Sequence, residues 1–295
     1  MGARDRRRAT LRRELHRTLV IEKASVGGLV ATTHLIENYP GFPEPIPGLE
    51  LMERMKAQAL RYGVEIAEFI EVKSLTKSDD GIFAVNIGSE VFNGKTVIIA
   101  GGSSPKTLGI PGEERLRGRG VSYCGICDGP FFADRDVAII GGGNSGLQEG
   151  EFLLKFVKSL TFVEFLPYIP ASKILQKRLH ETGKVRFIVN HEVVSIDGDD
   201  FVESMTIKPR TGHETQKLDV AGVFVYAGFI PSSDFAKDLV ELDDKGYIIA
   251  DERMMTRTPG LFVAGDIRAK RIRQITCATS DGTIAAIFAG AMLNK

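Results

Sequence analysis

Residues 138–146 read Ala-Ile-Ile-Gly-Gly-Gly-Asn-Ser-Gly, an apolar run that enters a glycine-rich turn. Gly141, Gly143 and Gly146 have the dinucleotide-binding spacing, in which glycines permit a tight turn, close approach of a pyrophosphate and contact between helix and sheet. We therefore predict a strand, a turn and a helix here, with Asn144 and Ser145 also contacting the nucleotide. Alone, this pattern is weak evidence, so its neighbourhood decides how it is interpreted.

A pair of cysteines lies directly upstream, where residues 123–129 read Tyr-Cys-Gly-Ile-Cys-Asp-Gly. Cys124 and Cys127 can close a small disulfide ring and reopen it at little geometric cost. Asp128 follows at once and can exchange a proton with a leaving thiolate, although it could equally cap a helix. A redox-active pair beside a nucleotide-binding turn indicates a disulfide oxidoreductase.

The composition sets limits on the class of protein. The 295 residues are enough for two domains, and 43% hydrophobic with 26% charged residues fits a globular protein. Lys plus Arg equals Asp plus Glu at 38 each, so we expect no nucleic-acid partner and no attraction to anionic membrane. No run approaches the ~18 apolar residues of a membrane span.

The cysteine count indicates where the pair works. Three cysteines cannot form the disulfide framework of a small secreted protein, so we expect a redox pair in the reducing cytoplasm. Zinc is the competing interpretation of two cysteines at this spacing. It would need two further ligands, and only Cys277 and five scattered histidines remain, so we expect no metal site.

Apolar runs and helical patterns alternate along the chain. We predict strands at 19–22, 96–100 and 160–164, and helices at 48–62 and 145–157. This alternation is typical of an α/β fold with parallel sheets. We place domain boundaries at 111/112 and 238/239, with residues 112–238 inserted between two parts of a first domain.

Several landmarks occur in a fixed order: residues 27–28, 37–42, 110–113, 124–128, 141–146, 264–266 and 273–274. Together they resemble the low-molecular-weight thioredoxin reductases, flavoproteins of the pyridine nucleotide-disulfide oxidoreductase class, over residues 19 to 295. The resemblance implies two Rossmann-like three-layer domains. The outer segments would bind FAD, the inserted one would bind the pyridine nucleotide, and the chain would form a homodimer.

The resemblance also implies a reaction. Reduced flavin would pass electrons to the Cys124–Cys127 disulfide, and the dithiol would then reduce thioredoxin or a similar small dithiol protein. Cys127 would face the flavin, Cys124 would attack the substrate disulfide, and Asp128 would protonate the leaving thiolate.

Further residues would hold FAD if the resemblance extends to them. Four of these sites have alternative interpretations: Glu22 as a strand-end acid, Asn38 as a loop amide, Asp266 as a helix N-cap, and Arg273 with Gln274 as a surface pair. The predicted FAD residues are Glu22 on the adenosine ribose, Gly27, Gly28, Asn38 by the flavin, Gly265, Asp266 on the ribityl or pyrophosphate group, and Arg273 with Gln274 by the isoalloxazine.

The expected electron donor follows from the end of the predicted strand 160–164. Glu164 lies eighteen residues after Gly146, about where an acid holds a ribose 2′-hydroxyl. NADPH-using members of the family carry a His-Arg-Arg run here and a further arginine. This chain instead has Glu164, Phe165, Leu166 and Pro170, which predicts NADH over NADPH. The alternative is ferredoxin or another donor, with the turn retained only as scaffold.

The N-terminal region departs from the family pattern. A first strand and a glycine-rich turn for the FAD pyrophosphate should precede Val20, yet the preceding nineteen residues contain one glycine and no such turn. Residues 1–17 hold seven arginines. We expect the recorded start to be truncated or read out of frame, which leaves a non-catalytic homologue without flavin as the rival of another class.

Overall fold

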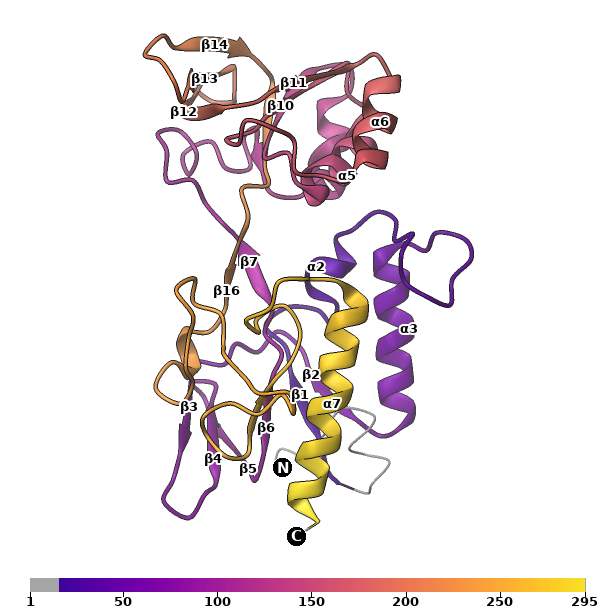
Figure 1. Ribbon diagram of the computed structural model, residues 1–295, viewed down its shortest axis with the longest axis vertical. Helices are drawn as coiled ribbons and strands as arrows, with labels where there is room; N and C mark the ends of the chain where they lie inside the picture. Colours follow the sequence, from indigo (N-terminus) through magenta and orange to yellow (C-terminus); the bar gives the residue numbers. More distant parts are fainter. Residues whose placement is uncertain (1–15, 295) are drawn as a thin grey trace. The chain divides into compact units, whose positions relative to one another are not determined.

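The computed structural model describes residues 16–294, which divide into two compact units (Figure 1). Residues 16–104 and 230–294 form the first unit, and Pro105–Phe229 forms the second. The second unit is thus inserted into the first, as predicted. Its ends lie seven and nine residues before the predicted boundaries. The division falls within a two-stranded ribbon of β7 (Ser103–Pro105) and β16 (Phe229–Pro231).

A parallel five-stranded sheet of order β11-β10-β9-β15-β8 forms the middle of the second unit. The elements of the second unit are β8 (Val121–Ser122), α4 (Gly125–Asp128), the 3-10 helix η1 (Gly129–Phe132), β9 (Asp136–Ile140), α5 (Asn144–Leu153), β10 (Ser159–Val163), α6 (Lys173–Glu181), β11 (Val185–Ile188), β12 (His191–Asp197), β13 (Ser204–Pro209), β14 (Gln216–Asp219) and β15 (Gly222–Val225). Strands β12, β13 and β14 form an antiparallel sheet of their own.

The second unit has three layers, because both faces of its parallel sheet are covered. Val137 and Ile139 of β9 pack against α5 and α6, whereas Ala138 and Ile140 pack against the antiparallel sheet. Figure 1 shows α5 and α6 on one side of β10 and β11, with β12–β14 on the other. A strand buried on both faces has no polar positions to alternate with, which explains the continuous apolar run that opens at Val137.

Three separate sheets lie within the described part of the first unit. Its elements are β1 (Leu19–Ile21), α2 (Gly28–Ala31), α3 (Gly48–Arg61), β2 (Glu65–Ala67), β3 (Ser74–Lys77), β4 (Phe83–Asn86), β5 (Val91–Gly94), β6 (Val97–Ile99), the 3-10 helix η2 (Asp234–Ala236), β17 (Leu261–Val263) and α7 (Ile275–Leu293). Strand β1 pairs with β2 and β6 with β17, both parallel, while β3, β4 and β5 are antiparallel.

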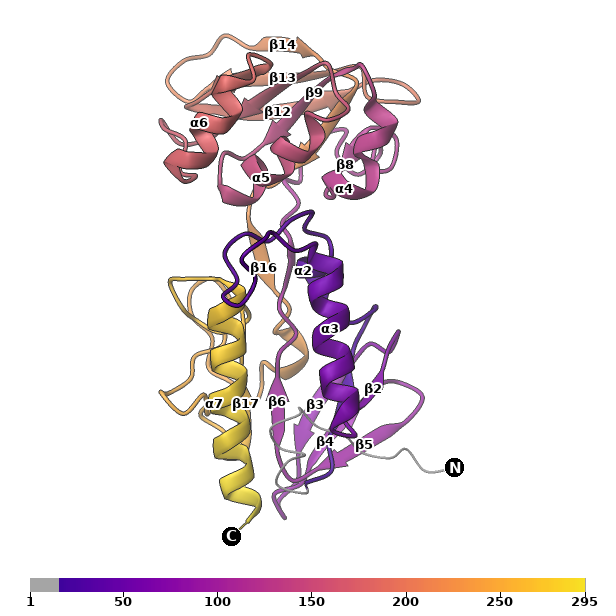
Figure 2. The ribbon, with the colours of Figure 1, turned by 90° about the vertical axis from the view of Figure 1, so that its right-hand side faces the viewer.

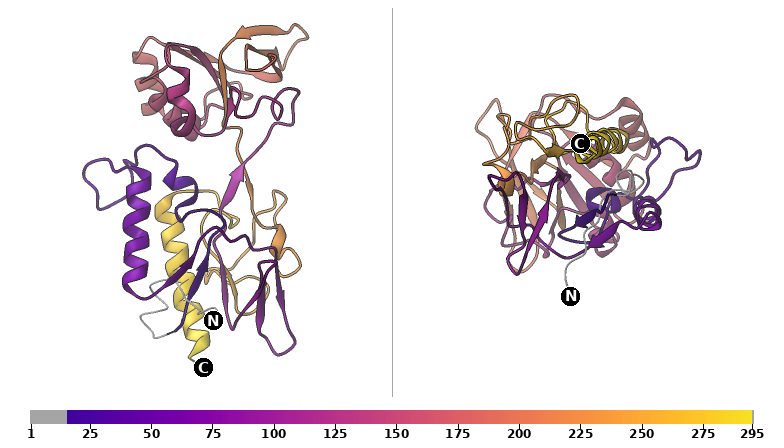
Figure 3. Two further views of the ribbon diagram at one scale, coloured as in Figure 1. Left: turned by 180° about the vertical axis from the view of Figure 1, so that it is seen from behind. Right: turned by 90° about the horizontal axis from the view of Figure 1, so that it is seen from below.

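The core of the first unit lies on both faces of β17. Leu261 and Val263 pack with Phe83 of the antiparallel sheet. Phe262 packs with Ala285 and other alanines of α7. Figure 2 shows α7 alongside β17, and Figure 3 shows β3–β5 on the side away from α7. The β6–β17 pair, the antiparallel sheet and α7 therefore support the loop that follows β17.

Helix α7 bears on the expectation that no segment spans a membrane. By length and composition this nineteen-residue helix could span a membrane, since an 18-residue window within it has a mean hydropathy of 1.2. The indication is weak, because a helix packed on a protein core passes the same test. Helix α7 does contact β17 and β6, and it carries the buried Asp281. The expected absence of a first strand and turn falls largely on residues 1–15, which lie outside the described residues.

Candidate functional site

The two cysteines of the second unit are joined in a disulfide at the start of the short helix α4. The Cα atoms of Cys124 and Cys127 lie 5.4 Å apart. Cys124 has extended backbone and acts as the N-cap, with its Sγ accepting a hydrogen bond from the Cys127 N–H at 3.2 Å. Cys127 is exposed and Cys124 half-buried, while the remaining Cys277 is free. The predicted pair is thus brought together at the surface of its unit, as a redox exchange site requires.

Neighbouring groups fix the loop that carries the disulfide. Ser122 Oγ accepts a hydrogen bond from the Cys124 N–H at 3.0 Å. The hydroxyl oxygen of Tyr226 accepts one from the Gly125 N–H at 2.9 Å. Asp128 ends α4, and its N–H donates to the Cys124 carbonyl. Asp128 is thus the last residue of α4 and also stands at the N-cap position of η1, where its side chain makes no capping hydrogen bond.

The glycine-rich turn adopts the geometry that its spacing predicts. Gly141 has a φ of 108° and lies against the Tyr226 carbonyl, since a Cβ there would be 2.3 Å from that oxygen. A Cβ on Gly146 would lie 2.4 Å from the Gly141 carbonyl oxygen, so helix and strand meet here. A Cβ on Gly143 would meet nothing within 4 Å. The turn is therefore closed on the protein side and open at Gly143, where a pyrophosphate would approach.

The polar side chains of the turn have different surroundings. Asn144 Oδ1 accepts a hydrogen bond from the Ser172 N–H at 2.8 Å and so ties the start of α5 to the start of α6. Ser145 is exposed on the first turn of α5. Gly143 stands at the N-cap of α5 and, as a glycine, supplies no side-chain acceptor to the first N–H groups of the helix.

Glu164 lies just beyond β10 and braces the turn. Its Oε2 accepts a hydrogen bond from the Gly142 N–H at 2.5 Å, and its Oε1 accepts one from the Leu166 N–H at 2.8 Å. The residue is only 7% exposed. Each carboxylate oxygen still has a second lone pair for a ribose hydroxyl. Glu164 thus has a structural role that sequence reasoning missed, and its predicted contact with ribose stays a prediction.

A guanidinium lies beside this strand end, although the sequence run itself has none. Arg210, just beyond β13, stacks over the exposed Phe165 ring at 3.9 Å from its centroid. The backbone explains the approach, since the Arg210 N–H donates to Asn190, whose N–H donates to Leu166. Local sequence could not reveal this contact, because forty-five residues separate the two side chains.

The predicted FAD residues near the N-terminus follow β1. Glu22 Oε1 accepts a hydrogen bond from the Ala24 N–H at 3.0 Å, and the side chain is half-exposed. Gly27 and Gly28 have φ of 135° and 53° where α2 begins. A Cβ on Gly27 would lie 2.7 Å from Ala31, whereas one on Gly28 would meet nothing. This turn requires glycine and leaves open space on one side.

Two predicted FAD residues that are far apart in the sequence, Asn38 and Gln274, contact each other in the first unit. Asn38 Nδ2 donates a hydrogen bond to Gln274 Oε1 at 2.9 Å, across 236 residues of sequence. The neighbouring Arg273 stacks on Tyr247 at 3.9 Å and donates from Nε to the Asp266 carbonyl at 3.4 Å. Asn38, Gln274, Arg273 and Asp266 therefore belong to one connected group of contacts.

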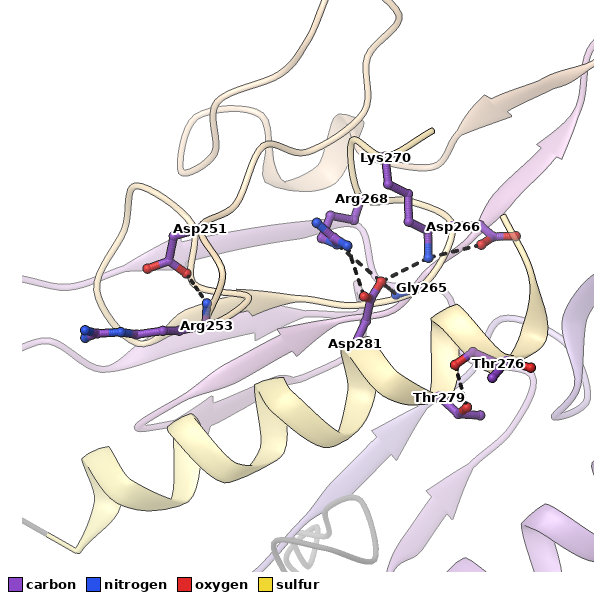
Figure 4. Close-up of polar contacts among 9 residues, drawn as sticks. All are labelled: Asp251, Arg253, Gly265, Asp266, Arg268, Lys270, Thr276, Thr279 and Asp281. Atoms are coloured by element: carbon purple, nitrogen blue, oxygen red, sulfur yellow. Dashed lines mark hydrogen bonds and ion pairs between the residues drawn. The ribbon is translucent and has the colours of Figure 1, made fainter. Parts of the chain in front are cut away.

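A buried charge cluster supports the Gly265–Asp266 turn (Figure 4). Asp281 of α7 is 4% exposed, and its carboxylate accepts hydrogen bonds from the Gly265 N–H, from Nε and a terminal nitrogen of Arg268, and from Lys270 Nζ. Lys270 Nζ also lies 3.5 Å from Asp266 Oδ1. Burial acts to raise the pKa of Asp281, but the hydrogen bonds and charges of Arg268 and Lys270 outweigh it and lower the pKa.

The Asp266 carboxylate provides the test of whether the FAD residues fit the group. Its Oδ1 is buried and accepts no hydrogen bond, although Lys270 balances its charge. A buried acceptor without a donor is unusual in a folded protein. A hydroxyl of a ribityl chain would supply that donor, and the open Gly28 would admit a bulky group. The described residues therefore fit FAD. Sequence reasoning found Asp266 but missed the Asp281 cluster that holds it.

A groove opens on the second unit where β9, β10 and β15 begin, at the opposite end of these parallel strands from Tyr226 and the disulfide loop. It measures about 700 Å³, and its lining includes Phe131 and Phe201, whose exposed fractions are 82% and 66%. Charged side chains, including Arg135, Lys158 and Glu203, share the lining. Phe131 belongs to η1, which follows the redox loop in the chain. Within residues 16–294, no group of three His, Cys, Asp or Glu side chains is placed to bind a metal.

Known proteins resemble this chain over nearly its whole length. The family described as pyridine nucleotide-disulphide oxidoreductase matches residues 7–282. Thioredoxin reductases of Peptoclostridium acidaminophilum and Mycolicibacterium smegmatis are each 39% identical, over 277 and 272 residues, covering 92% of this chain and 87% of each relative. The Lactococcus lactis thioredoxin reductase structure (FR conformation) is 36% identical with a TM-score of 0.93, covering 97% of this chain and 93% of that one.

Proposed function

Because this chain belongs to the pyridine nucleotide-disulphide oxidoreductase family and is an oxidoreductase of the thioredoxin reductase type, we propose its electron path. Electrons pass from a reduced nicotinamide, with NADH preferred over NADPH, through FAD to the Cys124–Cys127 disulfide, and then to thioredoxin or a similar small dithiol protein. One observation carries the proposal: the disulfide lies at the surface of the unit whose β9–α5 turn is open at Gly143 for a nucleotide.

The residues of this chain would divide the exchange step between them. Bound flavin would supply the two-electron relay between the nicotinamide and the disulfide. Reduction breaks the S–S bond, after which Cys124 as thiolate attacks one sulfur of the partner's disulfide and forms a mixed disulfide. Cys127 then attacks Cys124 Sγ and releases the reduced partner, while Asp128 gives a proton to the leaving thiolate. These roles follow the family resemblance and the placement of all three residues on one helical turn.

Two observations bear on the donor. Glu164 places a carboxylate at the end of β10 and would repel a 2′-phosphate, which supports NADH. Arg210 lies close by on Phe165, but it extends from another strand and stacks on an aromatic ring. One observation favours a second class of donor, ferredoxin or an unknown carrier. Both carboxylate oxygens of Glu164 already accept hydrogen bonds from backbone N–H groups, so this acid could serve to stabilise the turn without binding a ribose.

The surface supports the proposed partners. The groove with Phe131 and Phe201 offers exposed aromatic rings and mixed charge on the unit that carries the disulfide, which suits a small protein more than a small molecule. For the homodimer, Ile287, Phe288 and Met292 leave apolar surface exposed on α7. We also propose a cytoplasmic setting, because the working pair must be kept available for reduction.

Steady-state kinetics with thioredoxin as acceptor test the proposed function. With FAD present, NADH should support turnover with a higher kcat/KM than NADPH. Cys124→Ser and Cys127→Ser should each abolish turnover, whereas Cys277→Ser should leave it unchanged, because Cys277 is outside the disulfide. Full activity in either of the first two variants would refute the assigned site. Turnover with ferredoxin alone would select the alternative donor.

A further inference from the structure

Behind the redox disulfide, a glutamate that the proposed chemistry does not use meets the loop between the two cysteines. Glu149 projects from α5, and Tyr226 follows β15; both abut Gly125. A Cβ built on Gly125 would lie 2.6 Å from Glu149 Oε2 and 3.4 Å from the Tyr226 hydroxyl oxygen. Three elements of the second unit therefore converge at the residue next to Cys124.

The Glu149 side chain is partly buried, and no cation of the described residues acts on its carboxyl. Its Oε2 is inaccessible and accepts no hydrogen bond within the described residues. Burial raises the pKa of Glu149 to about 7, and the nearby Tyr226 hydroxyl and the N–H groups of Gly125 and Ile126 offset only part of this rise. The carboxyl therefore changes protonation near neutral pH, unlike an ordinary glutamate.

Within residues 16–294, the groups that act on the pKa of Glu149 include no cation. Burial, with the charges of Glu149 and Asp128 added to it, raises the pKa of Tyr226, so its hydroxyl stays neutral. On α5 itself, Glu151 points elsewhere and lies 3.8 Å from Arg178 of α6. Asp128 on α4 adds a second negative charge on the side of the disulfide. The charge balance around Glu149 is thus set by acids and by the sulfur atoms.

We propose that Glu149 is a positioning residue for the redox pair, which takes up a proton when the Cys124–Cys127 disulfide is reduced and releases it when the disulfide re-forms. Two electrons break the S–S bond and leave two sulfur anions; one takes a proton from solvent and the other stays as thiolate. That thiolate disfavours an ionised carboxylate nearby, so Glu149 binds the second proton. When a partner disulfide takes the electrons, the thiolate charge disappears and Glu149 loses its proton. The inference relies on the proposed function for the electron donor and acceptor.

The equilibrium between the chain and dithiothreitol tests this coupling without nucleotide, flavin turnover or protein partner. The reduced fraction is measured by acid quenching and alkylation at pH values from 6 to 8. Glu149→Gln replaces the carboxyl by a neutral group of the same shape, and Glu151→Gln is the matched control on the same helix. Because the assay needs only thiol exchange at the pair, its failure is separable from failure of NADH-dependent turnover.

Wild type and Glu149→Gln should have similar equilibrium constants near pH 6, where Glu149 is protonated in both redox states. By pH 8 the constant for wild-type reduction should lie roughly threefold or more below that of Glu149→Gln, since reduction must then add a proton to Glu149. Glu151→Gln should follow wild type. Equal pH dependence of wild type and Glu149→Gln would overturn the proposal, and so would a pair that does not exchange.

A second variant covers the case in which Glu149→Gln does not fold. Tyr226→Phe keeps the ring but removes the hydroxyl that lowers the pKa of Glu149. In wild type, the plot of the equilibrium constant for reduction against pH changes slope near the pKa of Glu149. In Tyr226→Phe this change of slope should occur at a higher pH. A change of slope at the same pH as in wild type would overturn the proposal, because a carboxyl that does not sense its facing hydroxyl is not the titrating group.

Discussion

Replacing Asp281 by asparagine should sharply destabilise the first unit. The substitution keeps the shape of the side chain but removes its charge and puts an N–H₂ group or a weaker acceptor opposite Arg268 and Lys270. The Lys270 side chain is 8% exposed and that of Arg268 is 20% exposed, so neither cation can recover full hydration. Lys270 keeps only Asp266, at 3.5 Å, and the Gly265 N–H loses a charged acceptor.

Breaking a buried ion pair by removing one partner costs about 3–5 kcal/mol. Asp281→Asn should therefore lower the free energy of unfolding of the first unit by about that amount, or its Tm by roughly 6–20 °C. Urea unfolding followed by circular dichroism measures this. Tryptophan fluorescence is no option, since the chain has no tryptophan. The two units need separate fits, because they need not unfold together.

A surface pair in the same unit provides the control. Glu50→Gln breaks the exposed i,i+4 pair with Arg54 and should cost at most about 1 kcal/mol. The pH dependence of stability provides a further check. Because the pKa of Asp281 is lowered in the folded state, its contribution to the free energy of unfolding is present above its unfolded pKa and is lost as pH falls below about 4. Wild type and Asp281→Asn should converge there. An effect at pH 7 no larger than that of Glu50→Gln would refute the reasoning.

Three further predictions concern the second unit. Gly112→Ala should lower the free energy of unfolding by about 3 kcal/mol or more, because its Cβ would lie 1.7 Å from the Ile196 carbonyl oxygen at a φ of 87°. Gly109→Ala is the control and should cost only about 1–2 kcal/mol, because Gly109 has a φ of 70° but faces open space. Equal losses of stability in urea unfolding would contradict this geometry. Glu164→Gln should reduce the ratio of kcat/KM for NADH to that for NADPH by roughly 10- to 100-fold, the value of a charged hydrogen bond, and an unchanged ratio would mean that the acid serves only the turn. Phe131→Ala should raise KM for the protein disulfide while leaving a small aromatic disulfide substrate unaffected, and parallel changes for both substrates would argue against docking at the groove.

The family, the α/β class and the inserted unit were predictable because their signals are local. The run 138–146 is a strand, a turn and the start of a helix, as its glycines indicate, and the helix expected at 48–62 spans Gly48–Arg61. The helix expected to end at 157 ends at Leu153. Local propensity did not set that boundary, because the residues beyond it form turns that bond back to the helix and to Arg135.

Other features depend on contacts between distant residues, which sequence spacing does not encode. Asp281 looked like an ordinary acid in a helix of small residues, but tertiary packing places it under Gly265 beside Lys270. Glu149 gave no signal either, since its unusual environment comes from α4 and Tyr226. Glu164 was found by spacing, yet its hydrogen bonds to the turn emerged only from the fold. The sequence therefore did not predict the roles of charged residues whose partners lie far away in the chain.

The most direct test of the central claim is a count of reactive cysteines before and after addition of the donor. The chain with FAD is held anaerobically with or without NADH, alkylated in denaturant, and weighed intact by mass spectrometry. One label, on Cys277, is expected without NADH, and three labels are expected with it, because electrons have opened the Cys124–Cys127 disulfide. A single label under both conditions would contradict transfer of electrons from NADH to this pair.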